Sequence, residues 1–90
     1  MLTISYSAKF KKDYKLAKKR GCDIRLLEEL LEILCAEHPL PQKYLDHALT
    51  GNYNGHRECH ITPNWLLIYK IENHLLVLTL IRTGTYSDLF

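Results

Sequence analysis

The spacing of apolar residues changes once along this chain, and that change limits the folds available to it. Between residues 8 and 38, apolar side chains recur every three or four positions, which is typical of amphipathic helices. From residue 56 onward they alternate or form short blocks, which is typical of strands. Helices followed by a run of strands predict an α+β fold with an antiparallel sheet.

Two helices are expected after a short N-terminal strand over residues 2–6. Ser7 and Asp23 are suitable N-caps, and Gly21 ends the first helix. Pro39 and Pro41 stop the second helix. The apolar faces consist of Phe10, Tyr14 and Ala17 in the first helix and of Leu27, Leu30, Leu31 and Leu34 in the second. Because the link between the helices is short, they are expected to pack as an antiparallel hairpin.

Three strands are expected over residues 56–61, 65–71 and 75–82. The segments between them are of turn length, so the strands should form an antiparallel meander. The predicted order is β-α-α-β-β-β in a single domain over residues 1–90. The helical hairpin is expected to cover one face of the sheet.

The composition argues against several classes of protein. No segment approaches the roughly 20 apolar residues of a membrane span, and the N-terminus lacks the residue order of a signal peptide. We therefore expect a cytoplasmic protein that does not bind membranes. The cysteines are odd in number and lack CxxC spacing, which argues against a disulfide framework and a structural zinc site. Neither a metal nor a cofactor is expected.

Positive charge is concentrated near the N-terminus, although the net charge of the whole chain is only +2. Asp13 is the one acidic residue among the first twenty. The lysines of the first helix are Lys9, Lys11, Lys12, Lys15, Lys18 and Lys19. A local positive patch attracts a polyanion such as RNA. The alternative is an ordinary solvated helix face.

Polar residues in the second half suggest a catalytic site. Glu58 and His60 share one face of their predicted strand, opposite Cys59 and Ile61, so they should face solvent or a ligand. A plain cross-strand ion pair is the alternative. Asp46, before His47, is interpreted as structural, capping local backbone.

These residue types suit the cleavage of RNA. That reaction needs a base for the 2′-OH, a cation for the phosphorane and an acid for the 5′-oxygen. His60, Arg82 and either His47 or Tyr86 match these roles. Tyr86 has an ordinary pKa of about 10, so it needs nearby cations to act as a base. Arg82 has an alternative role in a structural ion pair.

Two aromatic residues are candidates for stacking on an RNA base, namely Trp65 and Phe90. For Trp65, which follows a Pro-Asn turn, a role as a core anchor is the favoured interpretation. Asn64 in that turn is able to hydrogen-bond a nucleotide but not to exchange a proton.

Five segments together resemble the YafQ family of bacterial toxins, within the RelE superfamily of toxin–antitoxin systems. They are Asp46-His47-Ala48-Leu49-Thr50-Gly51, Arg57-Glu58-Cys59-His60-Ile61, Pro63-Asn64-Trp65-Leu66-Leu67-Ile68-Tyr69, Arg82-Thr83-Gly84-Thr85 and Leu89-Phe90. The resemblance extends over nearly the whole chain. It implies a RelE-like, microbial-RNase-like fold and an endoribonuclease that cuts mRNA in the ribosomal A site.

The resemblance also implies partners and site residues. The partners are mRNA, the ribosome and a cognate DinJ-like antitoxin of the ribbon-helix-helix type, through which alone operator DNA is contacted. The functional positions fall on His47, Glu58, His60, Asn64, Trp65, Arg82, Tyr86 and Phe90. Two of these depart from the family pattern. Asn64 stands where an aspartate is common, and Tyr86 stands where a histidine is common.

Three hypotheses follow for the activity. The leading one is a ribosome-dependent mRNA interferase, the toxin of a type II pair. The second is a weakly active or inactive homologue that binds antitoxin and RNA in autoregulation, which Asn64 and Tyr86 favour. The third is a ribonuclease that acts without ribosomes.

Overall fold

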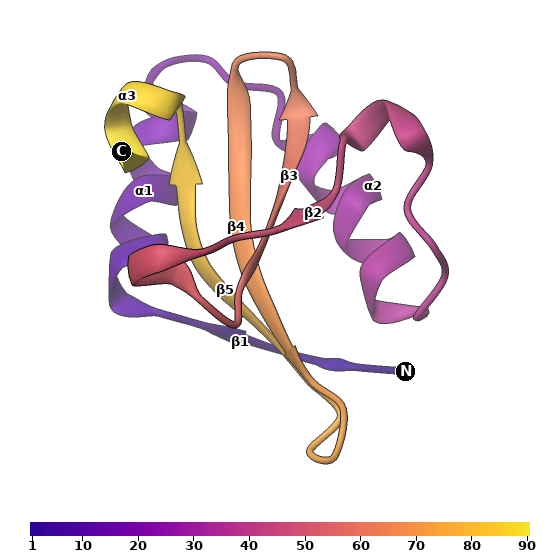
Figure 1. Cartoon of the computed structure of the whole chain (residues 1–90). Coiled ribbons are helices and arrows are strands. Elements are labelled where there is room, and N and C mark those ends of the chain that lie inside the picture. The colour runs from indigo at the N-terminus through magenta and orange to yellow at the C-terminus, as the bar shows by residue number, and fades with distance from the viewer.

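The computed structural model describes all 90 residues. Five strands, three helices and two short 3-10 turns make up the fold (Figure 1). They include the predicted order β-α-α-β-β-β and add a two-residue strand and a short C-terminal helix. They are β1 (Thr3–Tyr6), α1 (Ala8–Lys19), α2 (Ile24–Cys35), η1 (Gln42–Tyr44), β2 (His47–Ala48), η2 (Gly51–Tyr53), β3 (Arg57–Thr62), β4 (Trp65–Glu72), β5 (Val77–Gly84) and α3 (Tyr86–Leu89). The α+β class is confirmed. No helix is both long and apolar enough to cross a membrane.

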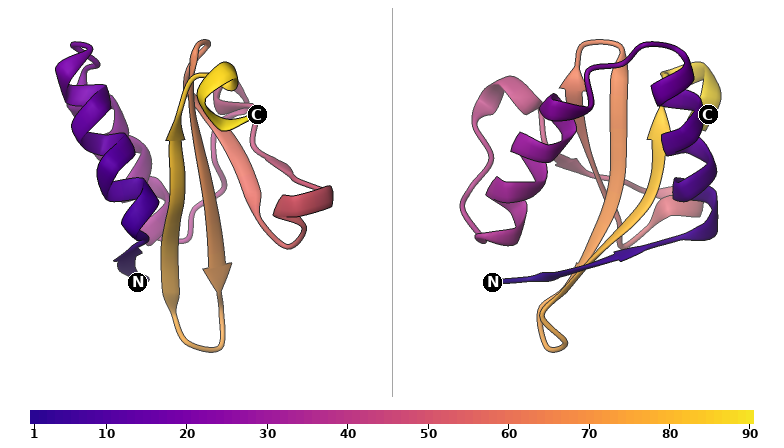
Figure 2. Two further views of the ribbon diagram at one scale, coloured as in Figure 1. Left: turned by 90° about the vertical axis from the view of Figure 1, so that its left-hand side faces the viewer. Right: turned by 180° about the vertical axis from the view of Figure 1, so that it is seen from behind.

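The strands form one sheet in the order β1-β5-β4-β3-β2. The predicted meander of β3, β4 and β5 is confirmed, because both pairings are antiparallel. β1, by contrast, lies beside β5 and pairs with it in parallel. Helices α1 and α2 lie on one side of the sheet, and α3 follows directly from the end of β5 (Figure 2).

Both predicted N-caps are confirmed. The Ser7 hydroxyl accepts a hydrogen bond from the Phe10 amide at 3.0 Å and donates one to the Ile81 carbonyl at 2.6 Å, which ties the start of α1 to β5. The Asp23 carboxylate accepts a hydrogen bond from the Arg25 amide at 3.1 Å. Each N-cap satisfies an amide that would otherwise have no partner in the first turn.

The two long helices end in the same way. After α1, Gly21 adopts a positive φ of 82°, and its amide and that of Cys22 donate back to the last helical turn. After α2, Glu37 has a positive φ of 61°, and the amides of Glu37 and His38 donate back to the last turn of that helix. This is the Schellman motif, in which a left-handed residue satisfies the last carbonyls. It ends α2 at Cys35, before the prolines that were expected to stop the helix.

One predicted strand boundary is wrong. β5 begins at Val77, because Asn73, His74, Leu75 and Leu76 form the turn after β4. The amides of Leu75 and Leu76 donate to the carbonyls of Glu72 and Asn73, and Leu76 has a φ of 54°. Both leucines are exposed, although their apolar character favoured a strand.

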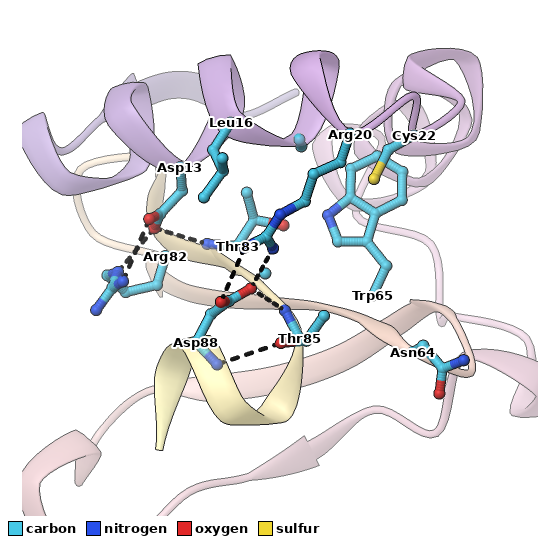
Figure 3. Close-up of a pocket in the computed structure, with 12 residues that line it drawn as sticks. Asp13, Leu16, Arg20, Cys22, Asn64, Trp65, Arg82, Thr83, Thr85 and Asp88 are labelled. Atoms are coloured by element: carbon cyan, nitrogen blue, oxygen red, sulfur yellow. Dashed lines mark hydrogen bonds and ion pairs between the residues drawn. The ribbon is translucent and has the colours of Figure 1, made fainter.

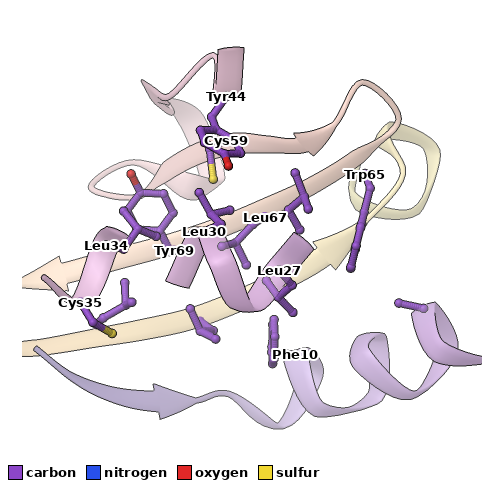
Figure 4. Close-up of a cluster of buried hydrophobic side chains, with 14 of the residues drawn as sticks. Phe10, Leu27, Leu30, Leu34, Cys35, Tyr44, Cys59, Trp65, Leu67 and Tyr69 are labelled. Atoms are coloured by element: carbon purple, nitrogen blue, oxygen red, sulfur yellow. The ribbon is translucent and has the colours of Figure 1, made fainter. Parts of the chain in front are cut away.

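The main core lies between the sheet and helices α1 and α2 (Figure 4). The two helices pack mainly on the sheet, α1 on β5 and α2 on β3, and not closely on each other as the predicted hairpin required. The core includes Phe10, Leu27, Leu30, Trp65, Leu67 and Tyr69. Leu66 and Ile68, which alternate with core residues on β4, pack on the opposite face with Leu89 of α3. β4 is therefore buried on both faces, as expected for a central strand. The three cysteines are free thiols, and burial raises the pKa of Cys59.

Candidate active site

The sheet register aligns three of the predicted site residues. His47 on β2 is opposite Glu58 on β3, Glu58 is opposite Ile68 on β4, and Ile68 is opposite Arg82 on β5. Directly opposite residues on neighbouring strands are within reach of one another. The polar row therefore arises from strand pairing between segments far apart in the sequence.

Glu58 lies at the centre of this row and is buried, with 5% of the residue exposed. Of the two expected environments, solvent or a ligand, this burial excludes the first. Its Oε1 lies 3.4 Å from His47 Nε2 and 4.0 Å from His60 Nε2. Glu58 Oε2 and His60 Nδ1 are buried and have no hydrogen-bond partner in the protein. Unpaired buried polar atoms are costly, so this cluster is poised to accept a polar ligand.

The orientation of the His47 ring is set by the backbone. His47 Nδ1 lies 2.7 Å from the Leu45 carbonyl oxygen, which only accepts hydrogen bonds, so this nitrogen is the donor of the contact. The other ring nitrogen, Nε2, then points to the Glu58 carboxylate.

A hollow of about 640 Å³ opens beside Glu58 and brings four predicted site residues together. Glu58 and His60 line it from β3, Asn64 from the following turn and Tyr86 from α3. Tyr86 is 69% exposed and stacks on Phe90 with 4.9 Å between ring centroids. Phe90 in turn contacts Tyr53 edge-on. Exposed aromatic rings next to acid and imidazole groups suit the binding and cleavage of a nucleotide.

Arg82 lies outside this hollow and forms an ion pair, which was the structural alternative. Its Nε lies 2.7 Å from Asp13 Oδ2, and its Nη2 lies 3.2 Å from Asp13 Oδ1 (Figure 3). The hydrogen bonds with Asp13 raise the pKa of Arg82. Asp13 was not predicted as a functional residue. The one available signal was its position as a lone acid within a basic helix.

Arg82 lines a smaller cavity of about 180 Å³ between α1 and the end of β5. Asn64 and Thr85 line both this cavity and the larger hollow, so the two are adjacent. Arg82 therefore lines a cavity that adjoins the candidate site, while its guanidinium is held by Asp13 of α1.

The other predicted residues have distinct environments. Trp65 is buried in the core, which fits its interpretation as an anchor and leaves no face free for a base. Asp46 is structural, but it pairs with Arg57 at 3.0 Å and accepts from the Tyr69 hydroxyl instead of capping local backbone. Phe90 is 55% exposed. The six lysines of α1 are all exposed.

Fold and site together define a small α+β protein in which His60, the buried Glu58 and the Tyr86 phenol line an accessible hollow. His47 lies outside the lining and contacts Glu58 from β2. No group of three or more His, Cys, Asp or Glu side chains is placed to hold a metal ion. The arrangement suits general acid–base chemistry on a polar substrate.

Known proteins identify the family. The model of the family described as "Bacterial toxin of type II toxin-antitoxin system, YafQ" matches residues 2–90. The mRNA interferase toxin YafQ of Escherichia coli K12 is 44% identical over 88 residues, which cover 97% of this chain and 94% of that protein. The chain belongs to the YafQ family of toxins.

Solved structures agree with this assignment. A metal-bound toxin from Helicobacter pylori superposes with a TM-score of 0.94 at 46% identity, covering all of both chains. YafQ in the E. coli DinJ–YafQ complex superposes with a TM-score of 0.90 at 42% identity, covering 100% of this chain and 99% of that one.

Proposed function

We propose that this chain is the toxin of a type II pair and an endoribonuclease that cleaves mRNA in the A site of translating ribosomes. A relative that is 44% identical is named an mRNA interferase toxin, which supports this activity. The observation that carries the proposal is the hollow that joins His60 and Tyr86 beside the buried Glu58. The site of action is accordingly the cytoplasm, where ribosomes translate.

In this proposal the RNA 2′-oxygen attacks phosphorus and the 5′-oxygen leaves. One group takes the proton from the 2′-oxygen, and a second group gives a proton to the 5′-oxygen. His60 is the main acid–base group and serves one of these two oxygens, and His47 or Tyr86 serves the other. The Glu58 carboxylate lies between the two imidazoles and is placed to hold their orientation. The free N–H groups of Arg82 stabilise the phosphorane from the adjoining cavity.

RNA binding is assigned to three surfaces. The exposed lysines of α1 contact phosphates of mRNA and ribosomal RNA without regard to sequence. Phe90 stacks on a base, and Asn64 hydrogen-bonds the nucleotide in the hollow. Salt should therefore weaken binding.

The proposed protein partner is a DinJ-like antitoxin of the ribbon-helix-helix type, which would also provide the only contact with operator DNA. Support comes from the E. coli DinJ–YafQ complex, whose toxin chain matches the whole of this chain. An inactive homologue that only binds antitoxin and RNA is the second candidate. Asn64 favours it, because an amide at the edge of the hollow cannot exchange a proton.

The test compares purified protein on programmed ribosomes with the same mRNA free in solution, with cuts mapped by primer extension. We expect cuts in the A-site codon and a rate on naked RNA lower by ~100-fold or more, since the ribosome orients the substrate. Equal rates on the two substrates would indicate a free ribonuclease. Absence of cuts together with tight antitoxin binding would indicate the binding module.

A further inference from the structure

Helix α1 holds the C-terminal end of the chain by an ion pair between residues distant in sequence. Arg20 Nη1 lies 2.6 Å from Asp88 Oδ2, and Arg20 Nη2 lies 3.3 Å from Asp88 Oδ1 (Figure 3). The hydrogen bonds from Arg20 hold the pKa of Asp88 below its ordinary value. This two-point contact fixes the orientation of the Asp88 carboxylate as well as its position.

Asp88 also completes the only turn of α3. Its Oδ2 accepts a hydrogen bond from the Thr85 amide at 2.8 Å, and the Thr85 hydroxyl accepts one from the Asp88 amide at 3.2 Å. This is a capping box. A helix of four residues is too short to be stable alone, so it depends on such contacts.

The backbone before α3 approaches Asp88 closely. A Cβ at Gly84 would lie 2.9 Å from Asp88 Oδ2, so a side chain there would push the carboxylate away. A second contact from α1 joins Asp13 to Arg82 and, at 3.1 Å, to the Thr83 amide. Asp13 in α1 and Arg20, the C-cap of α1, are about two helical turns apart and point toward the same side of the helix (Figure 3).

The segment held in this way carries the aromatic part of the candidate site. Tyr86 begins α3 and lines the hollow with His60, while Phe90 ends the chain and stacks on Tyr86. Only Leu89 of α3 is buried, so apolar packing alone gives this turn little support.

We propose that Arg20 and Asp88 are positioning residues, which set the place of Tyr86 against His60 by clamping α3 to α1. The inference rests on the proposed function, because it gives Tyr86 a part in cleavage. It assigns Arg20 to the geometry of the site and separates it from the neighbouring lysines, which contact phosphates.

The test uses Arg20→Ala with Arg25→Ala as the matched control. Arg25 pairs with Asp23 at 3.2 Å on α2, so its loss removes the same side chain and a similar surface ion pair away from α3. Two quantities are measured on the full chain. They are the hydrogen exchange of the Leu89 and Phe90 amides, which are bonded within α3, and the single-turnover cleavage rate on programmed ribosomes.

Arg20→Ala should speed exchange at both amides and lower the maximal cleavage rate by roughly 10-fold, since small misplacements of catalytic groups are costly. The ribosome concentration that gives half-saturation should be unchanged in Arg20→Ala. Arg20→Lys should restore part of the cleavage rate. The control Arg25→Ala should change neither the exchange nor the cleavage rate. A raised half-saturation with an unchanged maximal rate and unchanged exchange would make Arg20 a phosphate contact and overturn the proposal. If the wild-type chain fails to cleave, the proposed function fails, and unchanged exchange in Arg20→Ala would separately refute the clamp.

Discussion

Replacing His60 with alanine is expected to lower the rate of mRNA cleavage on ribosomes by ~10²–10⁴-fold, the usual contribution of a positioned acid–base group. His60 lines the hollow beside Tyr86, and its Nε2 lies 4.0 Å from the Glu58 carboxylate. Its other ring nitrogen is buried without a partner, so removal of the ring should not destabilise the fold through a lost hydrogen bond. Single-turnover cleavage and thermal unfolding measure the two effects.

His38→Ala is the matched control for this variant. His38 is exposed beyond the end of α2 and does not line the hollow, so its loss should leave cleavage at the wild-type rate. Antitoxin binding by His60→Ala, measured by calorimetry, should also be retained. Wild-type cleavage by His60→Ala would remove this residue from the mechanism.

Trp65→Ala is expected to reduce the free energy of unfolding by about 3–5 kcal/mol, because it removes a large buried aromatic ring from the core. Only 5% of Trp65 is exposed, and its ring packs in the cluster that joins the sheet to α1 and α2. Trp65→Phe should cost less, since it keeps most of the apolar volume and removes an indole N–H that has no partner. Urea unfolding measures both changes.

Phe90→Ala separates this core role from RNA recognition. Phe90 is 55% exposed, so its loss should change the free energy of unfolding by no more than about 0.5 kcal/mol. It should nevertheless weaken RNA binding, because the exposed ring is available to stack on a base. A Trp65→Ala variant with wild-type stability and weakened RNA binding would instead assign Trp65 to recognition.

Local sequence signals predicted the order of the elements well. Ser7 and Asp23 start the helices through contacts with residues nearby in the chain, and the strand periodicity identified the meander. The parallel pairing of β1 with β5 joins the two ends of the chain and leaves no local signal. The exposed Leu75 and Leu76 were misassigned because their apolar side chains suit a strand better than a turn.

The composition of the candidate site was predicted better than its environment. Alternation along β3 correctly placed Glu58 and His60 on one face, and the structure brings both together with Asn64 and Tyr86. The burial of Glu58 was missed, because that face is covered by a second apolar cluster that includes Leu89 of α3. The partner of Arg82 was missed because Asp13 lies 69 residues away in sequence.

The hollow between His60 and Tyr86 is proposed as the place where the phosphodiester is cleaved. The most direct test is the single-turnover cleavage rate of Tyr86→Phe on programmed ribosomes, since this change removes one exposed hydroxyl and keeps the ring that stacks on Phe90. We predict a rate lower by ~10²-fold or more at saturating ribosomes, with an unchanged half-saturation concentration. Cleavage at the wild-type rate by Tyr86→Phe would contradict the assignment of Tyr86, and the same result for His60→Ala as well would contradict this hollow as the catalytic centre.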